Sequence, residues 1–110
     1  MPIMAIYRSK EVDREAFNRY RAEAPIEPAP EGAIVHQVAF DEDGLLVIDV
    51  WEDEAQLKAF NENRIFPALN RLGITPAEPK VLQVHALWAA EDASRRNLAA
   101  PAPNPESVTA

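Results

Sequence analysis

The amino-acid sequence predicts a single domain of the α+β class, with elements in the order strand, helix, strand, strand, helix, strand. A length of 110 residues suits one hydrophobic core. Four short runs of apolar and β-branched residues are typical of strands, and two longer stretches carry apolar residues at helical spacing. The predicted architecture is therefore one four-stranded sheet packed against two helices.

The first half of the chain predicts a strand, a helix and a loop. Residues Ile3–Tyr7 are a short apolar run that suits the first strand. Asp13 is suited to cap a helix, because its carboxylate can accept from the free N–H groups of the first turn. Apolar residues at helical spacing continue from Phe17 until Pro25, which cannot continue a helix. The proline-containing stretch 26–32 then predicts a loop.

Two strands joined by a tight turn give the strongest strand signal. Ala33–Phe40 and Leu45–Trp51 are rich in β-branched residues, and the Asp-Glu-Asp-Gly sequence at 41–44 has the chemistry of a hairpin turn. With that turn, Phe40 faces Leu45. The second strand of the hairpin is apolar on both of its faces, so both faces are expected to be buried.

The second half of the chain predicts a long helix and a last strand. Asp53 is suited to cap the helix and Gly73 to end it. Pro67 should kink or split it near Ile65–Phe66, because proline lacks a backbone donor. The inner stripe of this helix consists of Leu57, Phe60, Arg64, Ala68, Leu69 and Leu72. The stretch Val81–Trp88 is the predicted last strand.

This element order is the plan of the ferredoxin-like fold. Two helices can cover only one face of a four-stranded sheet, yet the sequence makes the second face apolar as well. A second copy of the same sheet is the simplest cover, since two-fold homodimers are the commonest oligomers. We therefore expect a homodimer that pairs sheet to sheet.

The composition excludes several classes of partner and site. With 18 acidic against 11 basic residues and a formal net charge of −7, the chain lacks the basic footprint that nucleic acids and anionic membranes require. The absence of cysteine excludes disulfides, thiolate metal sites and cysteine nucleophiles. No apolar run reaches the roughly 18 residues of a membrane span, and the N-terminus lacks the features of a signal peptide. A soluble, cytoplasmic protein is expected.

A tail rich in proline and alanine is predicted to follow the folded domain. From Ala89 the composition shifts to Ala, Pro, Ser and charged residues, which offer little apolar surface to bury. We therefore expect a domain over 1–88 and a mobile tail over 89–110, with a helical turn near 92–98.

Two parts of the sequence resemble a known superfamily. The stretch His36–Phe60 and the later pattern that begins with Pro67-Ala-Leu and ends with Val84-His85 resemble the dimeric α/β-barrel superfamily. Within it, they are most similar to small proteins grouped with the antibiotic biosynthesis monooxygenases. The resemblance covers roughly residues 3–88. It implies a sheet in the order 4-1-3-2, with helices on one side and the dimer partner on the other.

The functional implication of the resemblance is a range of chemistries rather than one reaction. The superfamily includes cofactor-free oxygenases, haem-degrading oxygenases, aromatic isomerases and polyketide cyclases, and a shared fold does not fix a function. The haem-degrading members hold the iron with a histidine on the second helix. The second helix of this chain has no histidine, so haem is not expected.

His36 and Asp49 are the residues most suited to chemistry. The hairpin register places them opposite each other, and cross-strand partners lie about 5 Å apart between their Cβ atoms. The same register places Ile34 opposite Trp51 on the same face. A carboxylate beside an imidazole fixes its tautomer and prepares a base or proton relay near neutral pH. The alternative is a buried pair that satisfies itself and fixes the strand register.

Five further residues are candidates for ligand binding. Trp51 suits either a pocket wall or the core, and the superfamily's oxygenases carry a similar tryptophan at this strand end. Arg64 suits an acidic or phenolate oxygen of a ligand, or else a surface carboxylate. Asn61 lies beside it on the helix, and Tyr7 suits either the core or the pocket. His85 looks into the same cavity if its strand has the matching phase, and otherwise lies in the dimer interface.

No metal, cofactor or catalytic triad is expected. His36 and Asp49 supply two metal ligands, fewer than the three or four that a site needs. The chain has only 3 glycines and no glycine-rich phosphate loop, so nucleotide cofactors lack a platform. Its serines, at positions 9, 94 and 107, lie near the termini and form no convincing Ser-His-Asp triad.

Two functions fit these residues. The first is a cofactor-independent enzyme of the monooxygenase, isomerase or cyclase type, acting on a small aromatic or polyketide-type molecule, with His36 as base and Asp49 orienting it. The second is a non-catalytic dimeric module that binds a small ligand or a protein partner. An open, partly polar cavity around His36 would favour the enzyme, and a filled core would favour the module.

Overall fold

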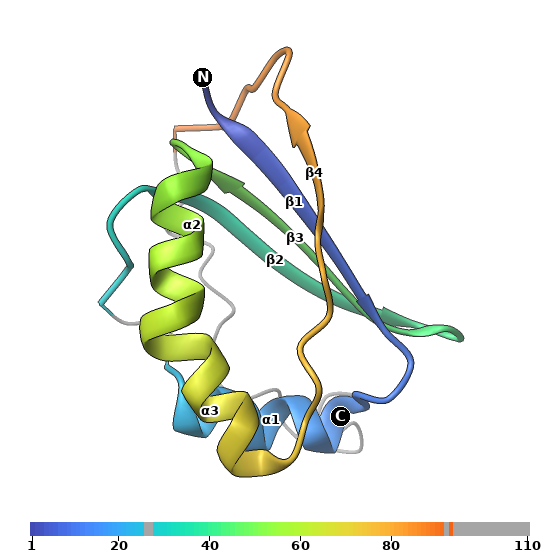
Figure 1. Cartoon of the computed structure of the whole chain (residues 1–110). Helices are drawn as coiled ribbons and strands as arrows, with labels where there is room; N and C mark the ends of the chain where they lie inside the picture. Colours follow the sequence, from blue (N-terminus) through green and yellow to red (C-terminus); the bar gives the residue numbers. More distant parts are fainter. Residues whose placement is uncertain (26–27, 92, 94–110) are drawn as a thin grey trace.

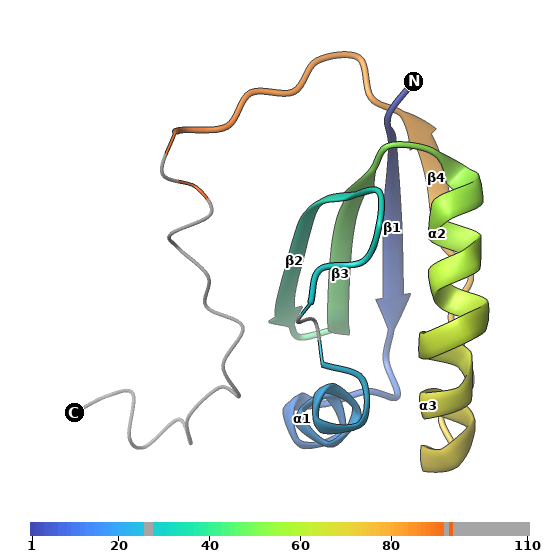
Figure 2. The same ribbon diagram turned by 90° about the vertical axis from the view of Figure 1, so that its left-hand side faces the viewer.

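A computed structural model describes residues 1–25, 28–91 and 93, and its helices and strands form two layers (Figures 1 and 2). The elements are β1 (Ile3–Ser9), α1 (Arg14–Glu23), β2 (Ala33–Asp41), β3 (Gly44–Trp51), α2 (Glu54–Phe60), η1 (Asn61–Ile65), α3 (Phe66–Leu72) and β4 (Lys80–Gln83). The strands pair antiparallel in the order β2-β3-β1-β4. This confirms the ferredoxin-like α+β fold and the predicted 4-1-3-2 order.

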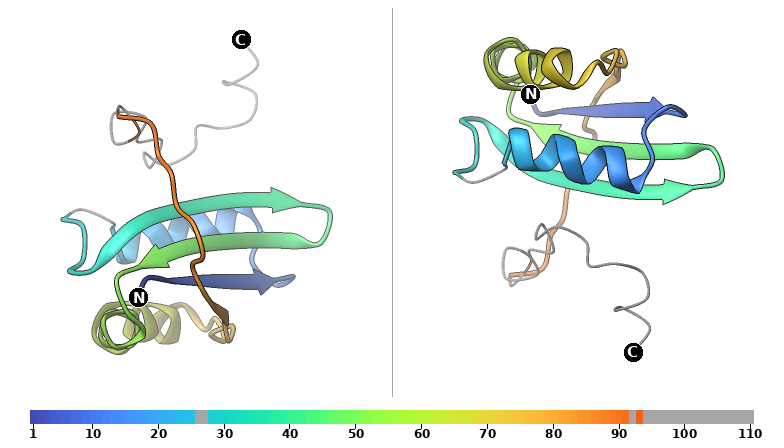
Figure 3. Two further views of the ribbon diagram at one scale, coloured as in Figure 1. Left: turned by 90° about the horizontal axis from the view of Figure 1, so that it is seen from above. Right: turned by 90° about the horizontal axis from the view of Figure 1, so that it is seen from below.

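The helices lie on one face of the sheet. Figure 3 shows α1 running along β2 and β3, with α2 and α3 beside β1. Asp13 caps α1 as predicted, since its Oδ1 accepts from the backbone N–H of Ala16 at 2.8 Å. Phe17 of α1 packs against Phe40 of β2, with ring centroids 6.0 Å apart. The core cluster consists of Ile3, Ala5, Trp51 and Leu57, with Tyr7, Ala33, Phe60 and Val81 packed against it.

The β2–β3 hairpin has the predicted register in its central part. Phe40 pairs with Leu45, and His36 pairs with Asp49. The turn is tight because Gly44 adopts a φ of 100°, a conformation that side chains disfavour. His36 and Asp49 therefore lie side by side on the face that the helices cover.

The start of β2 departs from the predicted register. A β-bulge lies between Ala33 and Val35, so Trp51 pairs with Ala33. The predicted pairing of Ile34 with Trp51 is therefore wrong, and Ile34 is 37% exposed. In a bulge two residues of one strand oppose one residue of its partner, and a count along the sequence does not reveal this.

The second helical stretch is split where Pro67 predicts. The π-helical segment η1 joins α2 to α3 and ends at Ile65, within the predicted break. Pro67 stands in the first turn of α3 and has no N–H to donate, so a wider turn before it accommodates the missing hydrogen bond. This wider turn carries two of the candidate site residues, Asn61 and Arg64.

The last strand is shorter than predicted. β4 ends at Gln83, so the predicted strand Val81–Trp88 is wrong beyond that residue. Gln83 pairs with Ile3, and Pro2, the residue before Ile3, has no N–H to extend the ladder. The chain then leaves the sheet edge on the side opposite α1 (Figure 3). Trp88 is 86% exposed.

The sheet face opposite the helices is apolar and only partly covered by the described residues, with Val50 7% exposed. Alternate residues of the strands form it, among them Met4, Ile6, Ile48, Val50 and Leu82. Leu82 is 40% exposed. The homodimer that would bury this face stays a prediction.

Most of the predicted tail at 89–110 lies outside the described residues, as does most of the predicted helical turn near 92–98. The boundary at residue 88 therefore stays a prediction. None of the described helices has the length and apolar character that a membrane crossing requires.

Candidate functional site

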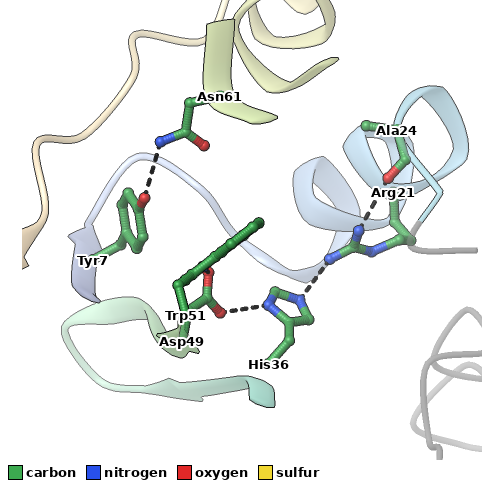
Figure 4. Close-up of polar contacts among 7 residues, drawn as sticks. All are labelled: Tyr7, Arg21, Ala24, His36, Asp49, Trp51 and Asn61. Carbon is green, nitrogen blue, oxygen red and sulfur yellow. Dashed lines mark hydrogen bonds and ion pairs between the residues drawn. The ribbon is translucent and has the colours of Figure 1, made fainter. Parts of the chain in front are cut away.

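A chain of polar side chains links α1 to the sheet (Figure 4). Nδ1 of His36 lies 2.6 Å from Oδ1 of Asp49. On the other side of the ring, Nε2 of His36 lies 2.8 Å from Nη2 of Arg21. Nη1 of Arg21 donates to the carbonyl oxygen of Ala24 at 3.0 Å. The end of α1, the middle of β2 and the middle of β3 therefore meet at one imidazole.

The two neighbours of His36 determine where its proton lies. A guanidinium has only donors, so Nε2 of His36 accepts from Arg21. An ionised carboxylate only accepts, so Nδ1 carries the proton and donates it to Asp49. In this arrangement His36 is the neutral Nδ1–H tautomer, placed between one positive and one negative group.

Asp49 is the buried member of this chain and His36 the accessible one. The Asp49 side chain is 11% exposed and the His36 side chain 34% exposed. Nε1 of Trp51 also points at Oδ2 of Asp49, but at 3.5 Å this is a long contact. The buried carboxylate thus depends mainly on His36 for a partner, which is the predicted pairing.

Sequence reasoning missed Arg21. Its guanidinium lies over the rings of Phe17 and Tyr20, 5.2 and 5.4 Å from their centroids. Burial lowers the pKa of Arg21, and the nearby Tyr20 and Asp49 act in the opposite direction. Arg21 follows Phe17 by four residues, which places it on the same stripe of the helix. The four-residue spacing from Phe17 is the sequence pattern that could have identified Arg21 as an inward-facing residue.

Tyr7 and Asn61, predicted separately, form a second polar pair beside the first. Nδ2 of Asn61 donates to the hydroxyl oxygen of Tyr7 at 3.1 Å (Figure 4). Burial raises the pKa of Tyr7, the hydrogen bond from Asn61 opposes this, and the charge of Asp49 adds to it. Burial also raises the pKa of Tyr20. Both phenols are therefore protonated at neutral pH.

Arg64 reaches the same end of α1 from η1. Its Nη2 donates to the carbonyl oxygen of Pro25 at 2.9 Å, and its guanidinium lies 5.4 Å from the centre of the Phe60 ring. Arg21 and Arg64 thus bind the carbonyls of two consecutive residues, Ala24 and Pro25. The carbonyl end of a helix carries partial negative charge, which favours cations there.

Trp51 belongs to the hydrophobic core. Its side chain packs against Phe60, with ring centroids 5.4 Å apart, and the residue is 2% exposed. The sequence left open whether Trp51 forms a pocket wall or part of the core, and the structure places it in the core. A contact between Trp51 and a ligand stays a prediction.

His85 lies apart from His36. It follows the end of β4, and β4 and β2 are the two opposite edges of the sheet. Beyond β4 the chain continues on the side of the sheet opposite α1 (Figure 3), whereas His36 faces α1. Of the two places that the sequence left open for His85, the cavity shared with His36 does not fit this arrangement, and a place in a dimer interface stays a prediction.

Two surface hollows lie at the hairpin end of the sheet. The first measures about 370 Å³ and is lined by Asp13, Arg14, Glu15, Phe40, Asp41 and Gly44. The second measures about 340 Å³ and is lined by Arg8, Ser9, Lys10 and Asp43. Neither includes His36 or Asp49. The His36 side chain is nevertheless 34% exposed.

The described residues contain no group of three or more histidine, aspartate or glutamate side chains that could hold a metal ion. His36 and Asp49 form a pair without a third such ligand among them.

Comparisons with known proteins give structural neighbours and no sequence relatives. No protein-family model matches the chain, and no curated protein matches it. The NE2512 protein of Nitrosomonas europaea, of unknown function, is 19% identical, with a TM-score of 0.58 over 81% of this chain and 92% of that one. A provisionally assigned antibiotic biosynthesis monooxygenase from Chloroflexus aurantiacus is 17% identical, with a TM-score of 0.56 over 80% and 95%. A variant of SnoaB, a cofactor-independent oxygenase from Streptomyces nogalater, is 15% identical, with a TM-score of 0.53 over 78% and 93%.

The fold is that of the antibiotic biosynthesis monooxygenase-like proteins. This confirms the resemblance that the sequence suggested, at the level of the fold. The proteins that share the antibiotic biosynthesis monooxygenase-like fold include a cofactor-independent oxygenase and a protein of unknown function. A fold with such varied members does not define an activity, so the activity is argued from the site.

Proposed function

We propose that this protein is a cofactor-independent enzyme of the monooxygenase or isomerase/cyclase type, acting on a small aromatic or polyketide-type molecule. The observation that carries the proposal is the pairing of a buried carboxylate with an accessible imidazole, Asp49 with His36, at 2.6 Å. Reactions of this type begin with the removal of a proton from the substrate, and an imidazole oriented by a buried carboxylate can serve as the base. The cofactor-independent oxygenase among the proteins of the same fold supports it.

His36 serves as the base through Nε2. It takes a proton from a phenol or an activated carbon of the substrate, and the electron pair of that O–H or C–H bond stays on the substrate as a phenolate or carbanion. Asp49 accepts the Nδ1–H bond throughout and stabilises the imidazolium that forms. Nε2 has one lone pair, so it accepts this proton only after its hydrogen bond with Arg21 is broken.

We propose that the working unit is a homodimer and that Tyr7, Asn61, Arg64 and Trp51 contribute to substrate binding. The apolar sheet face opposite the helices supports the dimer, because such a face is costly to leave in water. The hydrogen bond between Tyr7 and Asn61 supports their place near the base, since Tyr7 lies close enough to Asp49 for its charge to act on the phenol.

An activity screen with a matched pair of histidine variants tests this proposal. Phenols, naphthols and anthrones are incubated with the protein in air and under nitrogen, and the products are separated by chromatography. We expect turnover of at least one compound, with kcat lowered about tenfold or more in His36→Gln, because the base is lost. His85→Gln is the control, since His85 lies beyond β4, and it should leave kcat unchanged.

The outcome under nitrogen separates the two reaction types. A monooxygenase needs dioxygen as co-reactant and stops under nitrogen, whereas an isomerase or cyclase continues. Equal turnover by the parent protein and His36→Gln would contradict the assignment of His36 as base.

A non-catalytic module is the second candidate, and a specific observation favours it. Arg21 occupies Nε2 of His36, and both surface hollows lie at the hairpin end of the sheet. In this case the polar chain is a structural tie between α1 and the sheet. The module predicts no turnover of any compound in the screen, together with a loss of stability in His36→Gln.

A further inference from the structure

We propose that Arg21 and Arg64 bind the acidic group of a small aromatic ligand, and that this ligand draws Arg21 away from Nε2 of His36. The inference rests on the proposed function, whose ligand class it names. It makes Arg21 a ligand-binding residue that also covers the base until an acid is bound. Arg64 binds the same acidic group from η1.

The first reason is the charge balance of the two arginines. Arg8 and Arg71 form ion pairs with carboxylates, Arg8 at 2.9 Å and Arg71 at 3.2 Å. Arg21 and Arg64, like Arg14 and Arg19, take part in none of the ion pairs among residues 1–25, 28–91 and 93. Unlike those two, Arg21 and Arg64 have guanidinium groups held by hydrogen bonds. Their hydrogen-bond acceptors there are neutral, namely two backbone carbonyls and one imidazole nitrogen. Asp49 acts on Arg21 from the far side of the His36 ring, so an anion would add a direct ionic partner for both guanidinium groups.

The second reason is that the two guanidinium groups converge. They come from different elements, α1 and η1, and bind the carbonyls of consecutive residues, Ala24 and Pro25. The charges of both act on the phenol of Tyr20, where each works against the effect of burial on its pKa. A pair of guanidinium forks with a phenol donor beside them is suited to a carboxylate or phenolate oxygen.

The third reason is the apolar surface around the forks. The guanidinium of Arg21 lies over the rings of Phe17 and Tyr20, and that of Arg64 lies over Phe60. A ligand whose acidic group binds these forks therefore places its remaining atoms next to aromatic side chains. An aromatic acid matches both parts of this surface, whereas an inorganic anion matches only one.

The coupling to His36 follows from hydrogen-bond strength. A carboxylate accepts two parallel bonds from a guanidinium, and charge-assisted bonds are about twice as strong as neutral ones. A bound acid therefore competes with Nε2 of His36 for Nη2 of Arg21. Asp49 on β3 then remains the partner of His36, and Tyr20 and Asp49 are the titratable groups whose charges act on Arg21. Tyr7 on β1 and Arg64 on η1 act in turn on Tyr20.

Binding of benzoate, compared with its neutral analogue benzamide, tests the proposal by calorimetry at pH 7.5. We expect benzoate to bind about tenfold or more tightly than benzamide, because hydrogen bonds between charged groups are stronger than those to a neutral amide. Arg21→Met and Arg64→Met should each weaken benzoate binding about tenfold or more by the same reasoning. Arg21→Lys keeps the charge but not the fork, so it should fold and lose part of the affinity.

Arg14→Met is the matched control. Arg14 also lies on α1 and also places its guanidinium over an aromatic ring, that of Phe40, at 5.0 Å. Its removal should change benzoate affinity less than about twofold, because a charge at a distance is screened by salt. Equal loss in Arg14→Met and Arg21→Met would overturn the proposal, as would equal affinity for benzoate and benzamide or no binding of benzoate.

The release of His36 has its own readout. In the ¹⁵N spectrum of the His36 ring, saturation with benzoate should shift the Nε2 resonance, and benzamide should leave it in place. An unchanged Nε2 resonance in the benzoate complex would overturn the coupling. These measurements need no turnover, so benzoate bound through both arginines in a protein that converts no compound of the screen would defeat the proposed function and leave this inference intact.

Discussion

Replacement of Trp51 by alanine is expected to lower the free energy of unfolding by about 3–5 kcal/mol. Trp51 is 2% exposed and packs against Phe60, with ring centroids 5.4 Å apart. It also belongs to the core cluster with Ile3 and Leu57, so β1, β3 and α2 all meet at its ring. The substitution removes this apolar contact and leaves a cavity that the neighbours fill only in part.

Urea unfolding followed by far-ultraviolet circular dichroism measures this loss without relying on tryptophan fluorescence. All variants are compared at one protein concentration, because the stability of a dimer depends on it. Trp88→Ala is the matched control, since Trp88 is 86% exposed and its removal should change the unfolding free energy by less than about 0.5 kcal/mol. Similar losses in the two variants would contradict the assignment of Trp51 to the core.

Asp49→Ala is expected to lower the free energy of unfolding by about 2–3 kcal/mol. The substitution leaves Nδ1–H of His36 without its acceptor at 2.6 Å and removes the longer contact with Nε1 of Trp51. The loss should be smaller than the 3–5 kcal/mol typical of a fully buried pair, because the His36 side chain is 34% exposed and can bind water instead.

A double-mutant cycle shows whether Asp49 and His36 act as one unit. We expect His36→Ala to cost less in the Asp49→Ala background than in the parent protein, by about 1 kcal/mol or more. Asp43→Ala is the control, because Asp43 is an exposed residue of the hairpin turn and should contribute less than about 0.5 kcal/mol. Strictly additive losses for His36 and Asp49 would contradict a coupled pair.

The part of the site that the sequence predicts is the part that local rules determine. The turn at 41–44 and the alternation of a strand place His36 opposite Asp49, and the structure has this pairing. The bulge that displaces Ile34 depends on packing at the end of the sheet, so no count of positions reveals it. Counting residues from the turn therefore predicts the cross-strand pairs near the turn but not those beyond the bulge.

Arg21 and His85 show a second limit of the sequence. Arg21 occupies an inward position of α1, but its contact with Nε2 of His36 depends on how the helix packs on β2. His85 continues an apolar, alternating run, yet the strand ends at Gln83. Beyond it the N–H of Val84 donates to the carbonyl oxygen of Pro2, which has no N–H to donate in return. Both the contact of Arg21 and the end of the last strand depend on tertiary packing, so residue type and spacing do not predict them.

The hydrogen bonds of the His36 ring are the central claim, and ¹⁵N nuclear magnetic resonance at pH 7.5 tests it most directly. The geometry requires a proton on Nδ1, held by Asp49, and an unprotonated Nε2 that accepts from Arg21. We expect the Nδ1–H tautomer in the parent protein and its loss in Asp49→Ala. A ring that carries its proton on Nε2, or on both nitrogens, would contradict the proposed arrangement of base, orienting carboxylate and covering arginine.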